Sequence, residues 1–331
     1  MRGWDRPIES MVGWLSMPRN SLTVAVPTCN GGAHLAEALR GIRAQEGVAF
    51  DLLICDDRSD DDTLAVVRAE AGDRVRVVVN PQRLGLAGNW NRCAALCRTP
   101  LVTIFHQDDL MHPGHLAAHA TALLADDSLG MACSAAGVVD SAGCEVPATV
   151  VGRGNLGPTD RVFAAGAFVA ELAAGNPVRC SAVTLRASAL AEVGGFDPGL
   201  RYVVDWDCWL RIARLRGVAW LAKPTVSVRW HAASETHRFK GGIADIDETA
   251  ALLDDLYRRV DPSLPDARHL RRRADRMLSR AFLNRAYDAA CAGDRRLSLS
   301  CLRRAFAAWP GIVGTIAADP RLLGRLMVGA R

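Results

Sequence analysis

The stretch LVTIFHQDD, residues 101–109, is an apolar run of strand type that ends on two aspartates, and LLICDD, residues 52–57, repeats the pattern. A fifth acid, Asp205, lies in VVDWDCW, where another apolar run passes into a helical pattern. In an open α/β sheet the carboxyl ends of parallel strands meet at one crevice, so we expect these acids to converge. Two carboxylates about 4 Å apart repel by roughly 4 kcal/mol, so such a cluster shares a proton, binds a metal ion or binds a polar ligand. For each acid alone, capping of the following helix is the simpler explanation.

Short apolar runs alternate with helical patterns through the first two thirds of the chain. Between the runs, AHLAEALRGIRAQ puts Leu35, Leu39 and Ile42 on one helical face, and PGHLAAHATALLADD begins with Pro113, which suits a first helical turn. Apolar strands that alternate with helices predict an α/β fold with a mainly parallel central sheet and helices on both faces. The expected strands are LTVAVPT, LLICDD, VRVVVN, LVTIFHQDD, MACSAAGVVD and TVSVRWH.

The length and composition indicate one substantial core with a smaller appendage, since half of the 331 residues are hydrophobic. We expect a tail at 1–20, an α/β domain at 21–238 and a basic, amphipathic helical region at 239–331. No apolar run reaches the roughly 18 residues of a membrane span, and Asp5 and Glu9 stand where a signal peptide is apolar. The expected location is therefore the cytoplasm.

Ten cysteines are scattered through the chain without a CxxC pair or a zinc-type spacing. Several of them, including Cys55, Cys133 and Cys180, lie inside apolar runs. This pattern is typical of reduced thiols that fill a core, and it fits a reducing compartment.

Positive charge is concentrated at the end of the chain. From Arg258 to Arg331 there are 16 arginines and 6 aspartates, with no other charged residue. The helical patterns there set Leu278, Phe282 and Tyr287 against arginines, which predicts a small bundle. Clustered positive charge favours an anionic membrane surface, and the lack of a recognition motif or of interleaved aromatic residues excludes nucleic acid from the expected partners. We expect peripheral contact with the inner face of the plasma membrane; a solvated face, domain packing and a dimer contact are the alternatives.

Two loops follow the first two expected strands. VPTCNGG has glycines that let backbone approach a ligand, but neither GxGxxG nor GxxxxGK[ST] occurs in the chain, so the dinucleotide and P-loop fingerprints are absent. In DDRSDDDT, Ser59 and Asp62 have the spacing of a capping pair for the next helix. Capping does not account for Asp56 and Asp57, which precede it.

Six segments in order resemble the family 2 glycosyltransferases of GT-A fold, a Rossmann-like α/β architecture. The segments are VPTCNGGAHLAEAL, ICDDRSDDDT, NPQRLGLAGNWN, HQDDLMHPGHL, GGFDPGLRYVVDWDCWLR and VRWH, spread over residues 21–234. The resemblance implies transfer of a sugar from a nucleotide-sugar donor to an acceptor, with inversion and a divalent cation. The combination of HQDD and GNWN is similar to members described as rhamnosyltransferases.

Position by position, the resemblance implies that Pro27, Thr28 and Asn30 line the nucleoside pocket and that Asp56 and Asp57 bind the base. A carboxylate at a strand end can accept a hydrogen bond from the imide N–H of uracil or thymine, so a UDP or dTDP sugar is the expected donor.

The glycine-rich nucleotide loop of the family matches Gly85 and Asn91. The arginine that the family has just before this asparagine is Trp90 here, so no phosphate or base contact is assigned to position 90. Arg83 supplies a positive charge nearby.

The acidic metal motif of the family, D-x-D-D, reads His106-Gln107-Asp108-Asp109 in this chain. The resemblance implies that Asp108 binds the cation, with His231 as a further ligand to the metal or the diphosphate, and that His106 and Asp109 contact the nucleotide sugar. Hard oxygen ligands suit Mg²⁺ or Mn²⁺. The alternative is that the two aspartates only begin the turn before Pro113.

The motif VVDWDCWLR contains the catalytic base of the family, and Asp205 has the base position, with Val204 where glutamate is frequent. An inverting displacement needs a carboxylate that takes the proton of the acceptor hydroxyl. The local alternative is that Asp205 starts the helix, where the helix dipole favours an acid. Asp207, four residues before Arg211, is expected to form a surface ion pair, and the two tryptophans of the motif either stack on a sugar or fill the core.

The expected function is transfer of a sugar to a glycan or a lipid-linked acceptor in cell-surface polysaccharide biosynthesis. Two other classes of protein stay open. A non-catalytic nucleotide-sugar-binding subunit of a glycan assembly complex is favoured if His106 marks decay of the metal motif. A sugar nucleotidyltransferase shares the architecture but is expected to have basic residues in the glycine-rich loop after the first strand, and VPTCNGGAH has none.

Overall fold

The computed structural model describes most of the chain. The predicted tail at 1–20 and the last residues, 319–331, lie outside the described residues. The described part is 21–318 without 71, 73, 74, 147–155, 233, 240, 259–263 and 265.

The chain divides into two compact units, which are described separately. The first comprises Met1–Leu172 and Asn176–His231, and the second comprises Ala173–Gly175 and Ala232–Arg331. The predicted domain boundary after residue 238 lies near this division and stays a prediction.

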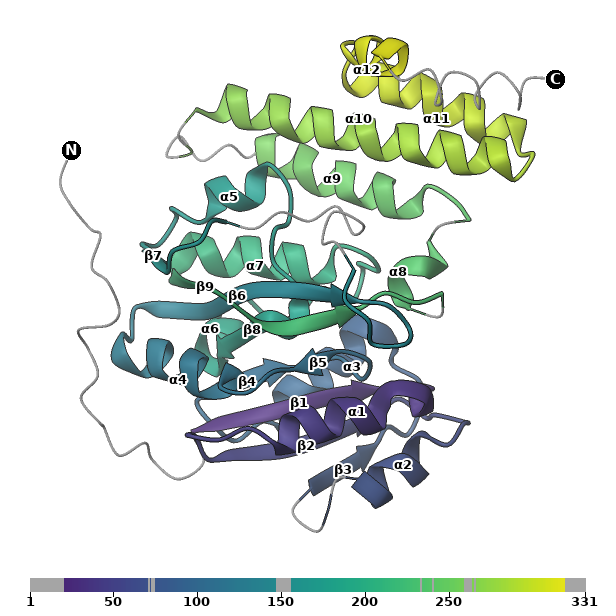
Figure 1. Cartoon of the computed structure of the whole chain (residues 1–331). Coiled ribbons are helices and arrows are strands. Elements are labelled where there is room, and N and C mark those ends of the chain that lie inside the picture. Colours follow the sequence, from purple (N-terminus) through teal and green to yellow (C-terminus); the bar gives the residue numbers. More distant parts are fainter. Residues whose placement is uncertain are drawn as a thin grey trace. The chain divides into compact units, whose positions relative to one another are not determined.

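The first unit is built on a nine-stranded sheet (Figure 1). Its strands are β1 (Leu22–Thr28), β2 (Phe50–Asp56), β3 (Val75–Val79), β4 (Leu101–Ile104), β5 (Leu110–Met111), β6 (Leu129–Val139), β7 (Arg161–Phe163), β8 (Val183–Arg186) and β9 (Gly217–Arg229). Their order is β3-β2-β1-β4-β8-β6-β9-β5, and β7 pairs with β9. Strands β1, β2, β3, β4, β6 and β9 run in one direction, and β5, β7 and β8 run in the other. The predicted α/β fold with a mainly parallel sheet is confirmed.

Helices cover both faces of this sheet. They are α1 (Gly32–Arg43), α2 (Thr63–Glu70), α3 (Gly85–Leu96), α4 (His115–Ala125), α5 (Val169–Ala173), α6 (Ala187–Glu192) and α7 (Val204–Leu215). On one face, α1 and α4 bury Leu35, Leu39 and Leu116 in a core with Val24 and Ile54 of the sheet.

On the opposite face lie α3 and α7. Cys55 follows Ile54 in β2, so its side chain points away from the first core, and it meets Cys93 of α3. An aromatic chain then links the two helices, since the Trp90 ring lies 5.1 Å from Phe196 and the Phe196 ring lies 6.1 Å from Trp209. Because β1, β2 and β4 are enclosed between these helix layers, only their ends reach a surface.

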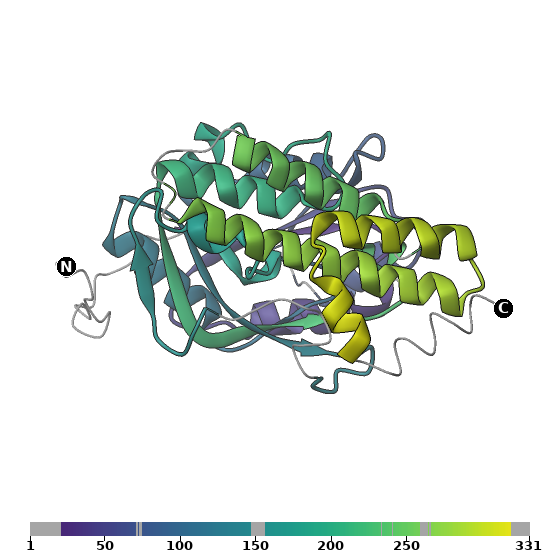
Figure 2. The same ribbon diagram turned by 90° about the horizontal axis from the view of Figure 1, so that it is seen from above.

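The second unit is helical, as the sequence pattern predicts. Its helices are α8 (Glu235–Arg238), α9 (Ala244–Arg258), α10 (Ala267–Cys291), α11 (Arg295–Ala308) and α12 (Ile312–Ala318). Helices α10 and α11 lie side by side (Figure 2), and the Ser279 hydroxyl donates to the carbonyl of Ala305 at 2.7 Å. Arg285, nearly buried, pairs with Asp245 of α9 at 2.8 Å. No helix in the described residues is long and apolar enough to cross a membrane.

Two buried histidines occupy the inner face of α4. His115 and His119 have no exposed surface, and their rings lie 4.1 Å apart. Nδ1 of His115 shares a hydrogen bond with the Thr225 hydroxyl, whereas neither ring nitrogen of His119 has a hydrogen-bond partner among the described residues. Burial lowers the pKa of His115 to about 3 and lowers the pKa of His119 well below its usual value. Both rings are therefore neutral in the folded protein at neutral pH.

This burial makes the stability of the first unit depend on pH. Above a pH of about 6.5 both histidines are neutral in the folded and unfolded chain, and below it only the unfolded chain takes up protons, so each histidine lowers the free energy of unfolding by roughly 1.4 kcal/mol per pH unit. Urea titrations at pH 7.5 and 5.5 measure the change, and His119→Leu is expected to remove one of the two histidine contributions, about 1.4 kcal/mol. Substitution of the exposed His269 serves as control. An identical pH dependence in the wild type and His119→Leu would contradict this account.

Candidate active site

The ends of β1 and β2 meet at one edge of the sheet. The Thr28 hydroxyl donates to the Asp56 carboxylate at 2.9 Å, and the Asp57 N–H donates to the Thr28 carbonyl at 2.8 Å. The loop after β4 reaches the same edge, because the Gln107 side chain bonds the backbone of Cys29. The sequence predicted that these loops meet at one crevice, and in the structure they are in contact.

The two acids after β2 are held by protein donors. Asp56, fully buried, accepts hydrogen bonds from Thr28 and from both the hydroxyl and the N–H of Ser59. Asp57, 3% exposed, accepts from the Asn80 side chain at 2.9 Å and from the N–H groups of Leu84 and Gly85 at 2.7 and 2.9 Å. Asp57 thereby fixes the first turn of α3.

The backbone conformation at the start of α3 explains why a glycine occupies that position. Gly85 has a φ of 74°, and nothing would meet a Cβ at this position, so the backbone angle and not crowding requires glycine. Its N–H then points at Asp57. The predicted nucleotide loop is therefore attached to the predicted base-binding acids.

The loop after β1 is tied to the loop after β2. Pro27 and Thr28 are buried at the end of β1, and Asn30 has a left-handed backbone with a φ of 51°. Asn30 accepts from the N–H of Asp60 at 3.0 Å, and its own N–H donates to the Ser59 hydroxyl at 2.9 Å.

The predicted capping pair of the next helix is wrong. Ser59 is occupied by Asp56 and Asn30, and Asp61 caps α2 by accepting from the N–H of Thr63 at 3.0 Å. The second carboxylate oxygen of Asp61 accepts from the N–H of Gly32 at the start of α1, so one acid serves two helix starts.

Asn91 joins α3 to the loop before α7. Its amide nitrogen donates to the carbonyl of Phe196 at 2.7 Å, and its amide oxygen accepts from the N–H of the same residue at 2.8 Å. A Cβ on Gly195 would lie 2.6 Å from this oxygen. The structure therefore uses both ends of the Asn91 side chain to hold a neighbouring loop.

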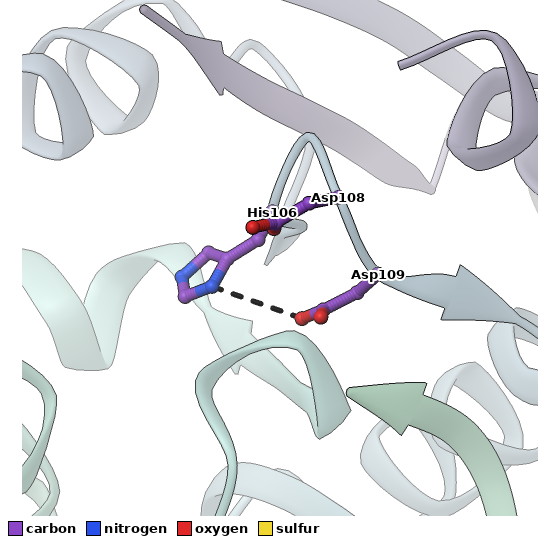
Figure 3. Close-up of side chains that lie close together, drawn as sticks. All are labelled: His106, Asp108 and Asp109. Atoms are coloured by element: carbon purple, nitrogen blue, oxygen red, sulfur yellow. Dashed lines mark ion pairs between the residues drawn. The ribbon is translucent and has the colours of Figure 1, made fainter. Parts of the chain in front are cut away.

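The loop after β4 carries the acidic metal motif (Figure 3), called here the metal loop, residues 106–109. Figure 3 shows the His106 ring turned toward Asp109, with Nδ1 3.7 Å from the carboxylate. Asp109 is 2% exposed, and its two oxygens accept from the Ser181 hydroxyl at 2.5 Å and from the N–H of Arg229 at 2.9 Å. The N–H of His106 also donates to Ser181 at 3.1 Å.

The two aspartates of the metal loop have opposite pKa shifts. Burial, and then the neighbouring charge of Asp108, raises the pKa of Asp109 to about 6. Burial also raises the pKa of Asp108, but the hydrogen bond with His231 and the charges of His106 and His231 outweigh it and hold that pKa below its usual value. Asp108 is therefore the carboxylate that stays ionised and available.

Arg229, at the end of β9, holds the metal loop from behind. Its side chain is 1% exposed and donates to the carbonyl oxygens of Asp108, Asp140 and Ser141 at 2.9 to 3.3 Å. It also pairs with Glu37 of α1 at 2.6 Å. A buried guanidinium with these partners fixes the backbone of Asp108.

His231 meets Asp108 at the front of the loop. Nε2 of His231 lies 2.9 Å from Oδ2 of Asp108, and the His34 ring of α1 packs edge-on against His231 with centroids 4.9 Å apart. Partial burial, followed by the charges of Arg229 and His231, lowers the pKa of His34.

These residues fit a divalent cation. In an octahedral shell two adjacent ligands at about 2.1 Å lie about 3 Å apart, so an ion that replaces the proton between His231 and Asp108, whose atoms are 2.9 Å apart, would meet both with little movement. His106, Asp108 and Asp109 also offer ligand atoms within 4.8 Å of one another, but both oxygens of Asp109 already accept hydrogen bonds from the protein. The pair of Asp108 and His231 is thus the better donor set.

Asp205 lies in the first turn of α7 and is 7% exposed. It accepts from the N–H of Trp206 at 2.7 Å and from the Asn176 side chain at 3.4 Å. The predicted ion pair of Asp207 with Arg211 is present at 2.6 Å. Both tryptophans of the motif are buried, so they fill the core and do not offer a stacking surface.

Four residues of the site had no role in the sequence interpretation: Gln107, Ser181, Arg229 and His34. Arg229 had a signal, since a charged residue inside the apolar run VSVRW is either at an edge or buried with partners. Gln107 occupies the x position of the D-x-D-D motif, where the motif specifies no residue type, so the sequence gave no signal for it. Ser181 and His34 are polar residues without a local pattern, and only the tertiary contacts reveal them.

Comparison with known proteins gives a consistent result. The family model described as glycosyl transferase family 2 matches residues 23–142. The uncharacterized protein MT1568 of Mycobacterium tuberculosis is 30% identical over 255 residues, which cover 74% of this chain and 78% of that protein. A Campylobacter jejuni protein, GalNAc(5)-diNAcBac-PP-undecaprenol beta-1,3-glucosyltransferase, is 32% identical over 104 residues, 30% of this chain and 33% of that protein.

Among solved structures, the mannosyltransferase PcManGT of Pyrobaculum calidifontis in complex with GDP-Man and Mn²⁺ has the same fold. The TM-score is 0.58 with 18% identity, over 95% of this chain and 85% of that chain.

The buried guanidinium behind the metal loop is expected to be important for stability. Arg229→Met leaves three carbonyl oxygens and the Glu37 carboxylate without their donors, and we expect a loss of about 3–5 kcal/mol in the free energy of unfolding. Glu37→Gln, at the half-exposed end of the same pair, should cost less than about 1 kcal/mol. Urea titrations compare the two variants, and equal losses would show that Arg229 acts only through the ion pair.

Proposed function

The chain belongs to glycosyl transferase family 2, and from this premise we propose that it transfers a sugar with inversion from a UDP or dTDP donor to a glycan or a lipid-linked acceptor in polysaccharide biosynthesis. One observation carries the proposal: Asp108 and His231 stand 2.9 Å apart beside the joined ends of β1 and β2. A cation site next to a loop cluster at strand ends suits a nucleoside diphosphate.

The donor would lie along the edge where β1, β2 and β4 end. In this proposal Pro27, Thr28, Asn30, Asp57 and the turn at Gly85 form the nucleoside end. Asp57 keeps one acceptor position on the oxygen that Gly85 approaches, since within the described part of the chain that oxygen has a single donor. Asp56 is fully buried and supports the site by holding Thr28 and Ser59.

At the other end, Asp108 and His231 would hold Mg²⁺ or Mn²⁺. When bound, the ion supplies Lewis-acid stabilisation of the departing diphosphate. The metal loop orients Asp108 through Arg229 and Asp109, so the carboxylate needs little rearrangement. The complex of PcManGT with GDP-Man and Mn²⁺ supports such a site in a protein of the same fold.

Asp205 is proposed as the base that accepts the proton of the acceptor hydroxyl. Its carboxylate is oriented by the Trp206 N–H and by Asn176, and it lies in the first turn of α7. One carboxylate in this role suffices for a single inverting displacement, in which the hydroxyl oxygen bonds the anomeric carbon as the diphosphate leaves.

The second unit offers a surface for a lipid-linked acceptor. Leu299 and Phe306 of α11 are 57% and 52% exposed, and Arg303 lies between them on the same helical face. The side chains of Arg295 and Arg296 are also exposed, and α11 contains no acid. Exposed apolar residues flanked by arginines suit the inner leaflet of a bacterial plasma membrane. The Campylobacter relative, whose name includes an undecaprenol-linked glycan, supports such an acceptor.

Two substitutions test the division of roles. Asp205→Asn should keep donor binding and lower sugar transfer by roughly 10²- to 10⁴-fold, because only the base is removed. Asp108→Asn should weaken Mn²⁺-dependent binding of the nucleoside diphosphate by about tenfold or more. Release of nucleoside diphosphate from a panel of nucleotide sugars, with Mn²⁺ or Mg²⁺, measures the first effect, and calorimetry measures the second.

Asp207→Asn is the matched control, since this acid lies in the same helical turn but pairs with Arg211. Full activity of Asp205→Asn would remove Asp205 from the mechanism. Donor binding without transfer in the wild type would favour a non-catalytic binding subunit, and release of pyrophosphate from a nucleoside triphosphate would favour a nucleotidyltransferase.

Membrane contact is tested separately. Sedimentation with vesicles of anionic phospholipid at low salt should retain the wild type and lose the variant in which Leu299 and Phe306 are both changed to serine. Leu215→Ser is the matched control, because Leu215 is a helix residue of similar exposure, 53%, in the first unit. Equal retention of both variants would contradict a role for α11, and failure of the wild type to sediment would contradict membrane contact.

A further inference from the structure

Gln107 occupies an unusual position in the metal loop. It stands between His106 and Asp108, and its side chain leaves the loop to bond the main chain of Cys29. The amide oxygen accepts from the Cys29 N–H at 2.9 Å, and the amide nitrogen donates to the Cys29 carbonyl at 3.1 Å. A side-chain amide that pairs with both the N–H and the carbonyl of one residue takes the place of a neighbouring strand.

This bridge begins where the sheet ends. Strands β1 and β4 pair in parallel up to Ala25 and Ile104, and the N–H of Phe105 adds a last bond to the carbonyl of Ala25 at 2.9 Å. Beyond that point the two chains no longer pair by backbone in this register, and the Gln107 side chain makes the next connection between them.

Gly31 leaves the space that Gln107 fills. A Cβ at this position would lie 2.2 Å from the amide oxygen and 2.4 Å from the amide carbon of Gln107. The backbone of Gly31 does not itself demand glycine, because its φ of −104° and ψ of 7° are open to other residues. The missing side chain is therefore explained by the neighbouring amide.

The bridge connects two parts of the donor site that have no shared strand. On one side, Asn30 and Thr28 are tied to the loop after β2. On the other, Asp108 follows Gln107 directly and meets His231. The Gln107 bridge is a direct contact between the two ends, in addition to the backbone pairing of β1 with β4.

We propose that Gln107 is a positioning residue that fastens the loop after β1 to the metal loop, so that the nucleoside end and the diphosphate end of the donor site keep a fixed separation. This inference rests on the proposed function, since it assumes a donor that spans both ends. A ligand held at two points gains from a preorganised distance between them, whereas a ligand that touches one end does not.

The first test compares whole and partial ligands. UDP, dTDP and GDP are each measured with Mn²⁺ against the wild type, and the tightest is kept together with its nucleoside and with Mn²⁺ pyrophosphate as fragments. Gln107→Ala, and Gln107→Met, which keeps the length but not the hydrogen bonds, should weaken the whole ligand about tenfold and each fragment less than about twofold. An equal loss for the whole ligand and one fragment would overturn the inference, because Gln107 would then act on that end alone.

The second test uses the close approach of Gly31. In the wild-type background Gly31→Ala displaces the Gln107 amide and should weaken the whole ligand about tenfold, as Gln107→Ala does. In the Gln107→Ala background the space is empty, and Gly31→Ala should add less than about twofold. Melting temperatures of the four proteins should show the same non-additivity. Independent, additive effects on binding and melting would overturn the contact as the cause.

The outcomes separate the inference from the function. Failure of the wild type to bind any of the three nucleotides contradicts the proposed donor site itself. Normal binding by the wild type together with unchanged binding by Gln107→Ala contradicts only the role of Gln107.

Discussion

The burial of the Asp109 carboxylate is the constraint on which the candidate site depends. A carboxylate that is 2% exposed is costly unless protein donors replace water, and here Ser181 and the N–H of Arg229 do so. Ser181 lies just before β8, and Arg229 is the last residue of β9. The two hydrogen bonds to Asp109 therefore hold these segments against the loop after β4. The Arg229 side chain then donates to the carbonyl of Asp108. The position of Asp108, whose carboxylate meets His231, therefore depends on the burial of Asp109.

The acidic pair after β2 also combines one acid that is enclosed by protein donors with one that keeps acceptor capacity. Asp56 is fully buried by its bonds to Thr28 and Ser59, and Asp57 organises the first turn of α3 while keeping acceptor capacity. Both oxygens of Asp56, Asp57 and Asp109 thus accept hydrogen bonds from the protein, whereas Asp108 is the acid that meets His231.

The sequence predicted the strand ends and their meeting, because apolar runs that end on acids carry information about both the sheet and its crevice. It also predicted the ion pair of Asp207 and the helices of the second unit. It could not predict β8 or the first half of β9, since VTLR is short and Pro224 interrupts GVAWLAKPTVSVR. The sequence predicted Ser59 as a helix cap. In the structure its hydroxyl donates to Asp56 instead, and this contact forms only in the folded chain. The bridge of Gln107 was invisible for the same reason, as its partner is 78 residues away.

Trp90 and His106, the two departures from the family pattern, are in contact with each other. Trp90 replaces an arginine and His106 replaces an acid, and the structure puts their rings 5.3 Å apart. Trp90 is 3% exposed and continues into Phe196 and Trp209, so this side of the metal loop is an aromatic layer. An acid at 106 would face that layer, and an arginine at 90 would be buried beside an imidazole. A guanidinium at position 90, which is 3% exposed, would need an anionic partner, because an unpaired buried charge costs several kcal/mol. A histidine at 106 beside a tryptophan at 90 avoids this cost, so His106 fits the aromatic layer in which it lies.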